Sequence, residues 1–194
     1  KQLLDAPALE ALLALAHDNQ VLALRDQMFA GAIVNATEQR PALHTALRGV
    51  GGGPDIADAV TGARAALRAF CAKIRADADI RSIVHIGIGG SVLGPKLLLE
   101  ALAADARGLE VRFCANVDGA DITDALAGLN PAHTLVVVVS KTFTTLETMA
   151  NAVVARDWLT ASLGSDAANA RLCAVTAAPA RAEAWGVTAA QVFM

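Results

Sequence analysis

The sequence predicts an α/β fold in which a parallel β-sheet is flanked by helices on both faces and preceded by a helical N-terminal region. After Asp79, short apolar runs alternate with helical stretches at the spacing of repeated βαβ units. Before that point, apolar side chains recur at helical intervals. We therefore expect two parts, a helical region over 1–80 and an α/β domain over 81–194.

The helical region carries two apolar stripes. The first lies near the start of the chain and consists of Leu9, Leu12, Leu13 and Ala16. The second stripe consists of Ile56, Ala59, Ala63, Leu67, Phe70 and Ile74. Three arginines of the same segment, Arg64, Arg68 and Arg75, lie mostly on other faces of the helix.

Between the two stripes, the segment from Asn35 to Glu38 has the spacing of a helix capping box. Pro41 follows where a proline fits an early helical turn. The glycine-rich segment 49–54 breaks the pattern, and we expect it to form a flexible loop.

In the α/β part, four apolar runs predict strands over Ser82–Ile86, Val111–Cys114, Leu135–Val139 and Leu172–Val175. The predicted helices cover about 94–104, 120–129 and 145–162, with a short one from about residue 179. Right-handed crossovers place the carboxyl ends of parallel strands along one edge of the sheet, where ligands usually bind. Both of the chemically rich loops fall on that edge.

The first of these loops follows the valine run 136–139 and has the sequence Ser-Lys-Thr-Phe-Thr-Thr over 140–145. Unpaired N–H groups at the start of the following helix, the Lys141 side chain and nearby hydroxyls favour an anion. Thr144 and Glu147 have capping-box spacing, so we expect Thr144 to cap the helix. That leaves Ser140, Lys141, Thr142 and Thr145 to face a ligand, for which a phosphate is the best candidate; the alternative is a plain polar turn.

The second loop, Gly87–Pro95, follows the strand that ends in His85-Ile86 and resembles two nucleotide-binding motifs without matching either. A dinucleotide fingerprint would need glycine or alanine where Val92 stands, and a P-loop would need lysine where Pro95 stands. What remains is a tight glycine turn that offers backbone N–H groups and the Ser91 hydroxyl. The alternative is a turn kept small for packing.

Other polar residues carry weaker signals. Asp118, in the segment 116–119, is expected to cap the helix that starts near Ala120. No pair among the four histidines has metal-ligand spacing, and His85 lies inside a strand, so the sequence assigns none of them a role. No Ser/His/Asp or Cys/His arrangement and no pair of carboxylates near the anion loop is evident.

Composition restricts the class of protein. The 194 residues include 18% charged residues and carry a formal net charge of −3, which gives no general bias toward nucleic acid or anionic membranes. The apolar runs are too short for a membrane span. Cys71, Cys114 and Cys173 are scattered, which favours reduced thiols in a cytoplasmic protein. The missing initiator Met and the apolar end Val192–Met194 predict a segment of a longer protein.

Taken together, these segments resemble the glucose-6-phosphate isomerase family. The resemblance rests on Gly87–Pro95 and Ser140–Thr145, and it extends to Asn35–Arg48, Asn116–Gly119 and Leu129–Pro131 in the order and spacing of that family. It implies the N-terminal portion of such an enzyme, built on a sugar isomerase (SIS) domain, with a homodimeric parent and no metal or organic cofactor. The parent's second SIS domain would be missing from this chain.

The resemblance also implies residue roles. Ser140, Lys141, Thr142 and Thr145 would hold the substrate phosphate, while Gly90 and Ser91 would line the sugar pocket. The family's glutamate base, ring-opening histidine, arginine and late lysine would lie beyond Met194, so no catalytic residue is assigned within this chain.

Two other classes of protein compete with this interpretation. A non-catalytic SIS-type regulatory module would share the hydroxyl-rich loop but would not be expected to carry the segment from Thr37 to Arg48. A nicotinamide-dependent oxidoreductase is disfavoured by Val92 in the glycine loop.

Overall fold

The computed structural model describes residues 4–37, 39–103 and 108–194. The chain forms two compact units that divide after Ala65, inside helix α3 (Gly53–Ala76). The predicted boundary near residue 80 instead separates the last helix of the N-terminal region from the first strand, and it stays a prediction about domains.

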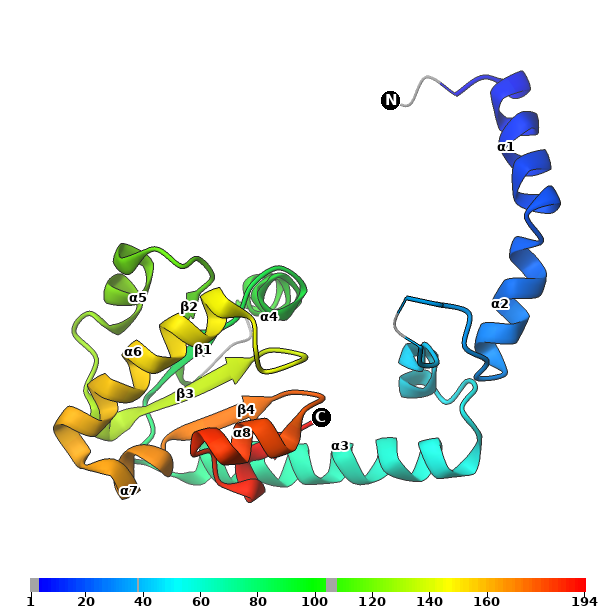
Figure 1. Cartoon of the computed structure of the whole chain (residues 1–194). Helices are drawn as coiled ribbons and strands as arrows, with labels where there is room; N and C mark the ends of the chain where they lie inside the picture. Colours follow the sequence, from blue (N-terminus) through cyan, green and yellow to red (C-terminus); the bar gives the residue numbers. More distant parts are fainter. Residues whose placement is uncertain (1–3, 38, 104–107) are drawn as a thin grey trace. The chain divides into compact units, whose positions relative to one another are not determined.

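The first unit is helical, as predicted. It contains α1 (Ala6–Asp18), α2 (Val21–Phe29), a 3₁₀ helix, η1 (His44–Arg48), and the first part of α3 (Figure 1). The Asp5 carboxylate caps α1 by accepting a hydrogen bond from the Ala8 N–H at 2.9 Å. No residue of α1 or α2 is buried, so their leucines lie exposed on this unit.

The segment between α2 and η1 differs from the prediction. The Asn35 side-chain oxygen accepts hydrogen bonds from the Thr37 N–H and hydroxyl, which is a local turn and not a helix cap. Glu38 lies outside the described residues. Pro41 precedes η1 in irregular chain, so its predicted place in a helical turn is wrong.

The second unit contains the predicted parallel sheet. Its strands are β1 (Ser82–Ile86), β2 (Glu110–Cys114), β3 (Thr134–Val139), β4 (Leu172–Val175) and β5 (Val192–Phe193). They pair in the order β2-β1-β3-β4-β5, and every pairing is parallel. The two-residue strand β5 was not predicted.

Helices connect the strands and cover the sheet (Figure 1). They are α4 (Gly90–Ala101), α5 (Gly119–Leu126), α6 (Leu146–Leu163), α7 (Ser165–Asn169) and α8 (Pro179–Trp185), with 3₁₀ turns at Pro131–His133 and Ala189–Gln191.

Two helix boundaries and one additional helix differ from the prediction. α4 begins four residues early because Gly89, at φ 52° and ψ −123°, turns the chain directly into the helix. α5 ends at Leu126, since the chain leaves the helical region at Ala127 and reaches φ 72° at Gly128. α7, which was not predicted, is a short turn that follows Gly164.

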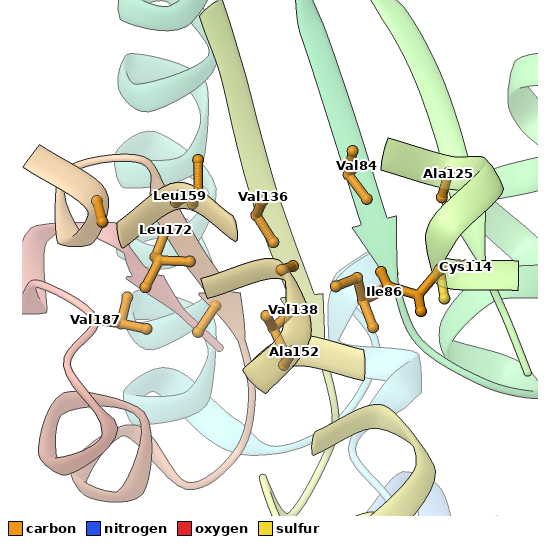
Figure 2. Packing of buried hydrophobic residues seen from close by; sticks show 14 of the residues in the cluster. Val84, Ile86, Cys114, Ala125, Val136, Val138, Ala152, Leu159, Leu172 and Val187 are labelled. Carbon is orange, nitrogen blue, oxygen red and sulfur yellow. The ribbon is translucent and has the colours of Figure 1, made fainter. Parts of the chain in front are cut away.

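Side chains alternate between the two faces of the sheet and form two clusters. On one face, fully buried residues of β1, β3 and β4 pack against Ala152 and Leu159 of α6, with α5 and α8 alongside (Figure 2). On the other face, Leu135, Cys173 and Phe193 pack with Phe70 and Ile74 from the end of α3. The helical coverage of both faces is therefore confirmed.

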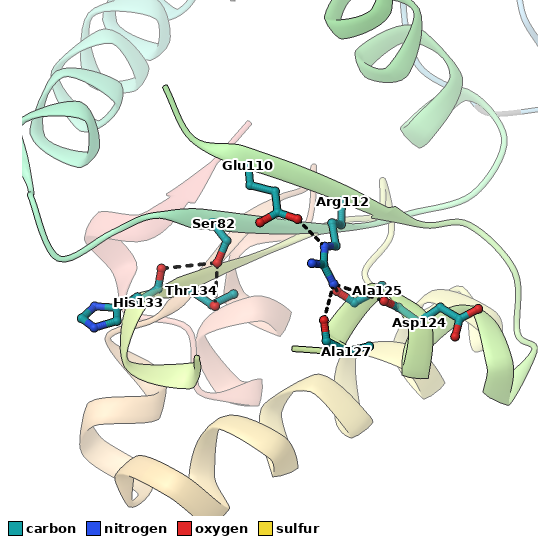
Figure 3. A network of polar contacts seen from close by, with 8 residues as sticks. All are labelled: Ser82, Glu110, Arg112, Asp124, Ala125, Ala127, His133 and Thr134. Carbon is teal, nitrogen blue, oxygen red and sulfur yellow. Dashed lines mark hydrogen bonds and ion pairs between the residues drawn. The ribbon is translucent and has the colours of Figure 1, made fainter. Parts of the chain in front are cut away.

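Two sets of polar contacts lie on the sheet, one between β2 and the end of α5 and the other at the N-terminal ends of β1 and β3 (Figure 3). Arg112 of β2 pairs with Glu110 at 2.7 Å and donates to the carbonyl oxygens of Asp124 and Ala127 at the end of α5. A cation there stabilises the negative end of the helix dipole. The buried hydroxyls of Ser82 and Thr134 satisfy each other at 2.8 Å.

We predict that Phe193→Ala lowers the free energy of unfolding by about 3 kcal/mol, because the Phe193 ring is buried and lies 4.9 Å from the Phe70 ring, centroid to centroid. Urea unfolding followed by circular dichroism measures the change. As a control, Leu97→Ala removes an exposed leucine of α4 and should change the free energy by less than about 0.5 kcal/mol. Equal stability of Phe193→Ala and the wild type would contradict the inclusion of β5 in the sheet.

Candidate functional site

The candidate site lies where β1 and β3 end side by side. β1 leads through α4 to β2 on one side, while β3 leads through α6 to β4 on the other. The chain therefore leaves these two neighbouring strands in opposite directions. A crevice at such a reversal of strand order is the usual ligand site in open parallel sheets. The glycine loop follows β1 and the hydroxyl-rich loop follows β3, so both loops start at this place on the sheet edge.

The glycine loop is pressed against the end of β3. A Cβ atom on Gly87 would lie 3.1 Å from the Val139 carbonyl oxygen and 3.1 Å from the Ser91 Cβ atom. Only a residue without a side chain fits this contact comfortably. Gly90 and Ser91 follow as the first residues of α4. The Ser91 N–H donates to the Ile88 carbonyl of the glycine loop at 3.0 Å, which leaves the Ser91 hydroxyl as the candidate contact for a ligand.

The loop after β3 turns its carbonyl groups toward the protein. The Ser140 carbonyl accepts from the Phe143 N–H at 3.2 Å. The Lys141 carbonyl accepts from the Ala177 N–H at 3.0 Å and from the Thr176 hydroxyl at 3.2 Å. With these acceptors occupied internally, the loop offers an anion less opposing negative charge.

Two hydroxyl pairs organise the same loop. Ser140, which is buried, lies 3.1 Å from the hydroxyl of Thr145, and the Thr142 and Thr144 hydroxyls are 2.8 Å apart. Thr145, and not Thr144, is the N-cap residue of α6, and its side chain makes no capping hydrogen bond. The prediction that Thr144 caps the helix is therefore wrong, and the Thr144 hydroxyl pairs with Thr142 instead.

Phe143 anchors the loop in an unusual backbone conformation. It is buried and has φ 54°, a region that bulky side chains rarely adopt. Its ring meets the edge of Trp185 with the centroids 5.8 Å apart. Arg156 holds Trp185 in turn, with its guanidinium 4.3 Å from the ring centroid and 2.9 Å from the Trp185 carbonyl. Packing thus stabilises a strained turn directly beside the hydroxyls.

Arg181 of α8 is a cation of this region that the sequence prediction missed. Its guanidinium donates to the Thr142 carbonyl oxygen at 2.9 Å. α8 follows β4, so Arg181 reaches the loop from the neighbouring strand connection. The signal available in the sequence was a lone basic residue on a short predicted helix, which is too common to single out.

Comparison with known proteins decides the family. The sequence model described as phosphoglucose isomerase matches residues 1–194, the entire chain. The chain belongs to the phosphoglucose isomerase family. The prediction from the sequence motifs is confirmed at this level.

Relatives with assigned activities agree with this membership. The chain is 45% identical to the glucose-6-phosphate isomerase of Caulobacter sp. (strain K31) over 207 residues, which is all of this chain and 38% of the relative. It is 47% identical to that of Leptothrix cholodnii over 190 residues, covering 95% of this chain and 35% of the relative. The chain therefore spans under two fifths of the length of these family members.

Solved structures give the same result. A glucose-6-phosphate isomerase from Chlamydia trachomatis matches with a TM-score of 0.72 and 32% identity, covering 89% of this chain and 35% of that one. A hypothetical protein from Thermus thermophilus matches with a TM-score of 0.63 and 28% identity, covering 97% of this chain and 41% of that one. The parallel sheet with its helical N-terminal region is thus a fold that solved relatives share.

In this family member, the loop after β2 is held from two helices. The Asp118 carboxylate caps α5 by accepting from the Ala120 N–H at 2.9 Å, as predicted. Asp121 accepts from the N–H groups of Ala115 and Asn116 at 2.7 and 2.9 Å. Asn151 of α6 donates to the Asn116 carbonyl. This loop therefore lies fixed at the same sheet edge as the two candidate loops.

The remaining features do not point to a metal or a membrane. Among the described residues, no group of three or more His, Cys, Asp and Glu side chains is placed to hold a metal ion. No described helix combines the length and apolar character needed to cross a membrane. The three cysteines are free; Cys71 is exposed, and burial raises the pKa of Cys114 and of Cys173 to about 12.

We predict that Asp121→Asn destabilises the protein by about 1 kcal/mol at pH 7, because two backbone hydrogen bonds lose their charged acceptor. Burial acts to raise the pKa of Asp121, but the hydrogen bonds from Asn116 and Ala115 outweigh it and bring the pKa below 3.8. The stabilisation is therefore complete above pH 3.8 and is lost as the pH falls through the lowered pKa of the folded state.

Urea unfolding of the wild type and Asp121→Asn between pH 7 and pH 3 checks this. The difference in free energy should hold down to about pH 4 and shrink below it. Asp157→Asn, at an exposed position of α6, serves as the matched control and should unfold like the wild type at pH 7. If the difference in free energy of unfolding between the wild type and Asp121→Asn grows as the pH falls, the stabilising role assigned to the ionised Asp121 carboxylate is contradicted.

Proposed function

We propose that this chain is the sugar-phosphate-binding part of a glucose-6-phosphate isomerase, which interconverts glucose 6-phosphate and fructose 6-phosphate through an enediol intermediate. One observation carries the proposal: a hydroxyl-rich loop with a lysine stands at the ligand-binding edge of the sheet in a chain that matches the isomerase family over its whole length. The domain proposed to hold the ligand is a SIS domain over residues 81–194.

In this proposal, the loop after β3 binds the substrate phosphate. Ser140, Lys141, Thr142 and Thr145 are the proposed phosphate ligands. The internal hydrogen bonds of the loop carbonyls and the burial of Phe143 support this role, because they hold the loop in one shape before a ligand arrives. A phosphate on such a loop also gains from the dipole of α6, whose N-terminus begins at Leu146.

Gly90 and Ser91 would line the sugar pocket from the opposite side. Their place in the first turn of α4, with Gly87 packed against the end of β3, supports this arrangement. Holding a phosphate remote from the reacting carbons orients C1 and C2 of the sugar against the catalytic groups. Those groups, including the glutamate base and the ring-opening histidine, would come from the part of the parent protein that this chain does not include.

We further propose a homodimeric parent that acts in the cytoplasm without a metal or organic cofactor. A non-catalytic regulatory module that binds sugar phosphates is the alternative. The match of the family model over the helical region as well as the α/β part favours the enzyme. Isomerase activity of the full-length parent separates the two possibilities.

We expect the 194-residue chain to bind glucose 6-phosphate and fructose 6-phosphate weakly and to bind glucose far less, because the phosphate supplies the recognised charge. Amide chemical-shift titration by NMR measures both affinities. Ser140→Ala should weaken sugar-phosphate binding by about 10-fold through the loss of one charge-assisted hydrogen bond. Lys73→Ala, a lysine on α3, is the control for a general loss of positive charge.

The same titrated sample should show no isomerase turnover in a coupled assay, since the proposed base is absent. Binding of glucose as tight as that of glucose 6-phosphate would contradict the phosphate site. Isomerase turnover by the purified chain would contradict the proposal that the catalytic base lies in the rest of the parent protein.

In the full-length parent, we predict that Lys141→Ala lowers kcat/KM for glucose 6-phosphate by roughly 10–100-fold, the effect of one lost charge-assisted contact to the phosphate. Steady-state kinetics in both directions measure the change. Lys73→Ala again provides the matched control and should leave kcat/KM unaltered. Wild-type kinetics for Lys141→Ala would rule out the proposed role.

A further inference from the structure

The carbonyl group of Ser91 lacks its normal helical partner. In an α-helix, the carbonyl of residue i accepts from the N–H of residue i+4, which for Ser91 is Pro95. Proline has no backbone N–H, so the first turn of α4 contains a carbonyl that the helix itself cannot satisfy. A buried carbonyl without a partner would destabilise the turn.

His85 supplies the missing donor. Its Nε2 atom lies 2.8 Å from the Ser91 carbonyl oxygen. Because a carbonyl only accepts hydrogen bonds, Nε2 must carry the proton. His85 belongs to β1 and is 9% exposed, and its ring packs against Phe113 of β2 with the centroids 5.2 Å apart. The donor is therefore held by the rigid centre of the sheet.

Ser91 is thus fixed from two directions. His85 holds its carbonyl from β1, and Gly87 lies against its Cβ atom and carbonyl where a Cβ on residue 87 would be only 3.1 and 3.2 Å away. The same glycine contacts the carbonyl of Val139, the last residue before the hydroxyl-rich loop. The position of the Ser91 hydroxyl relative to that loop depends on this arrangement.

We infer that His85 is a positioning residue: its hydrogen bond to the Ser91 carbonyl replaces the N–H that Pro95 lacks and sets the first turn of α4 to face a sugar phosphate. This inference rests on the proposed function. It gives His85 a role that strand position and histidine spacing in the sequence did not indicate. Burial lowers the pKa of His85, while the hydrogen bond to the Ser91 carbonyl opposes this shift.

A measurement on the wild-type chain tests the hydrogen bond directly. ¹⁵N chemical shifts of the His85 imidazole at pH 7 should show a neutral ring protonated on Nε2. A neutral ring protonated on Nδ1 alone would overturn the inference without any variant that has to fold.

Binding measurements on the wild type and its variants test the consequence. His85→Leu removes the donor and should raise the dissociation constant for glucose 6-phosphate by about 10-fold, with a much smaller change for inorganic phosphate held by the loop after β3. Pro95→Ala adds an N–H at residue 95 and should bind like the wild type. In the double variant, that N–H replaces the lost donor, so the effect of His85→Leu should fall below about threefold. His85→Gln keeps a donor near the Nε2 position and should bind within a few-fold of the wild type.

The outcomes distinguish a failure of the proposed function from a failure of the inference about His85. If the wild type binds neither glucose 6-phosphate nor inorganic phosphate, the proposed function fails and this inference fails with it. If the wild type binds both but His85→Leu weakens them equally, or if Pro95→Ala gives no rescue, His85 has only a general structural role and the inference alone is overturned.

Discussion

The arrangement of the candidate site depends on one close contact between neighbouring strands. At the ends of β1 and β3, a Cβ atom on Gly87 would lie only 3.1 Å from the Val139 carbonyl oxygen, tighter than an ordinary van der Waals contact. This contact joins the start of the glycine loop to the start of the hydroxyl-rich loop. Because β1 and β3 are adjacent and parallel while their connections leave in opposite directions, two loops far apart in the chain begin side by side at one edge of the sheet, the usual place for a ligand in such folds. A larger residue at 87 would require Ser91 or Val139 to shift by a few tenths of an ångström, which changes the spacing of the two loops.

On the β3 side, the hydroxyl-rich loop is held in place by the packing of Phe143 against Trp185. The backbone of the loop is strained at Phe143, and a left-handed conformation costs a bulky residue about 1–2 kcal/mol. Burial of the ring against Trp185 offsets that cost, and Arg156 keeps Trp185 in place. The turn also directs the carbonyls of Ser140 and Lys141 into the protein. The packing that stabilises the domain therefore also shapes a surface on which hydroxyl and N–H groups predominate.

Much of this was predictable from the sequence, and the failures have local physical causes. The strands from Ser82 and Leu172 were predicted correctly because buried parallel strands are continuous apolar runs. β5 has two residues, too few for any periodicity, and its place depends on the Phe193 contact with Phe70. Glycine at position 90 is a poor helix former, so the early start of α4 was missed. No pattern in the sequence reveals that His85 satisfies a carbonyl left open by Pro95.

The proposed division between this chain and the rest of its parent has a thermodynamic consequence. Glucose 6-phosphate and fructose 6-phosphate carry the same phosphate on C6 and differ only at C1 and C2. A site that grips the phosphate therefore stabilises substrate, intermediate and product alike, and by itself leaves the equilibrium between the two sugars unchanged. Uniform binding of the phosphate raises kcat/KM but not kcat. A contribution to kcat must come from orientation, which requires the phosphate loop and the wall of the sugar pocket to keep a fixed separation. The Gly87 contact and the His85 hydrogen bond are two interactions that join the first turn of α4 to the sheet carrying that loop. Positional precision, more than affinity for the phosphate, is thus the property that these two residues would supply to catalysis.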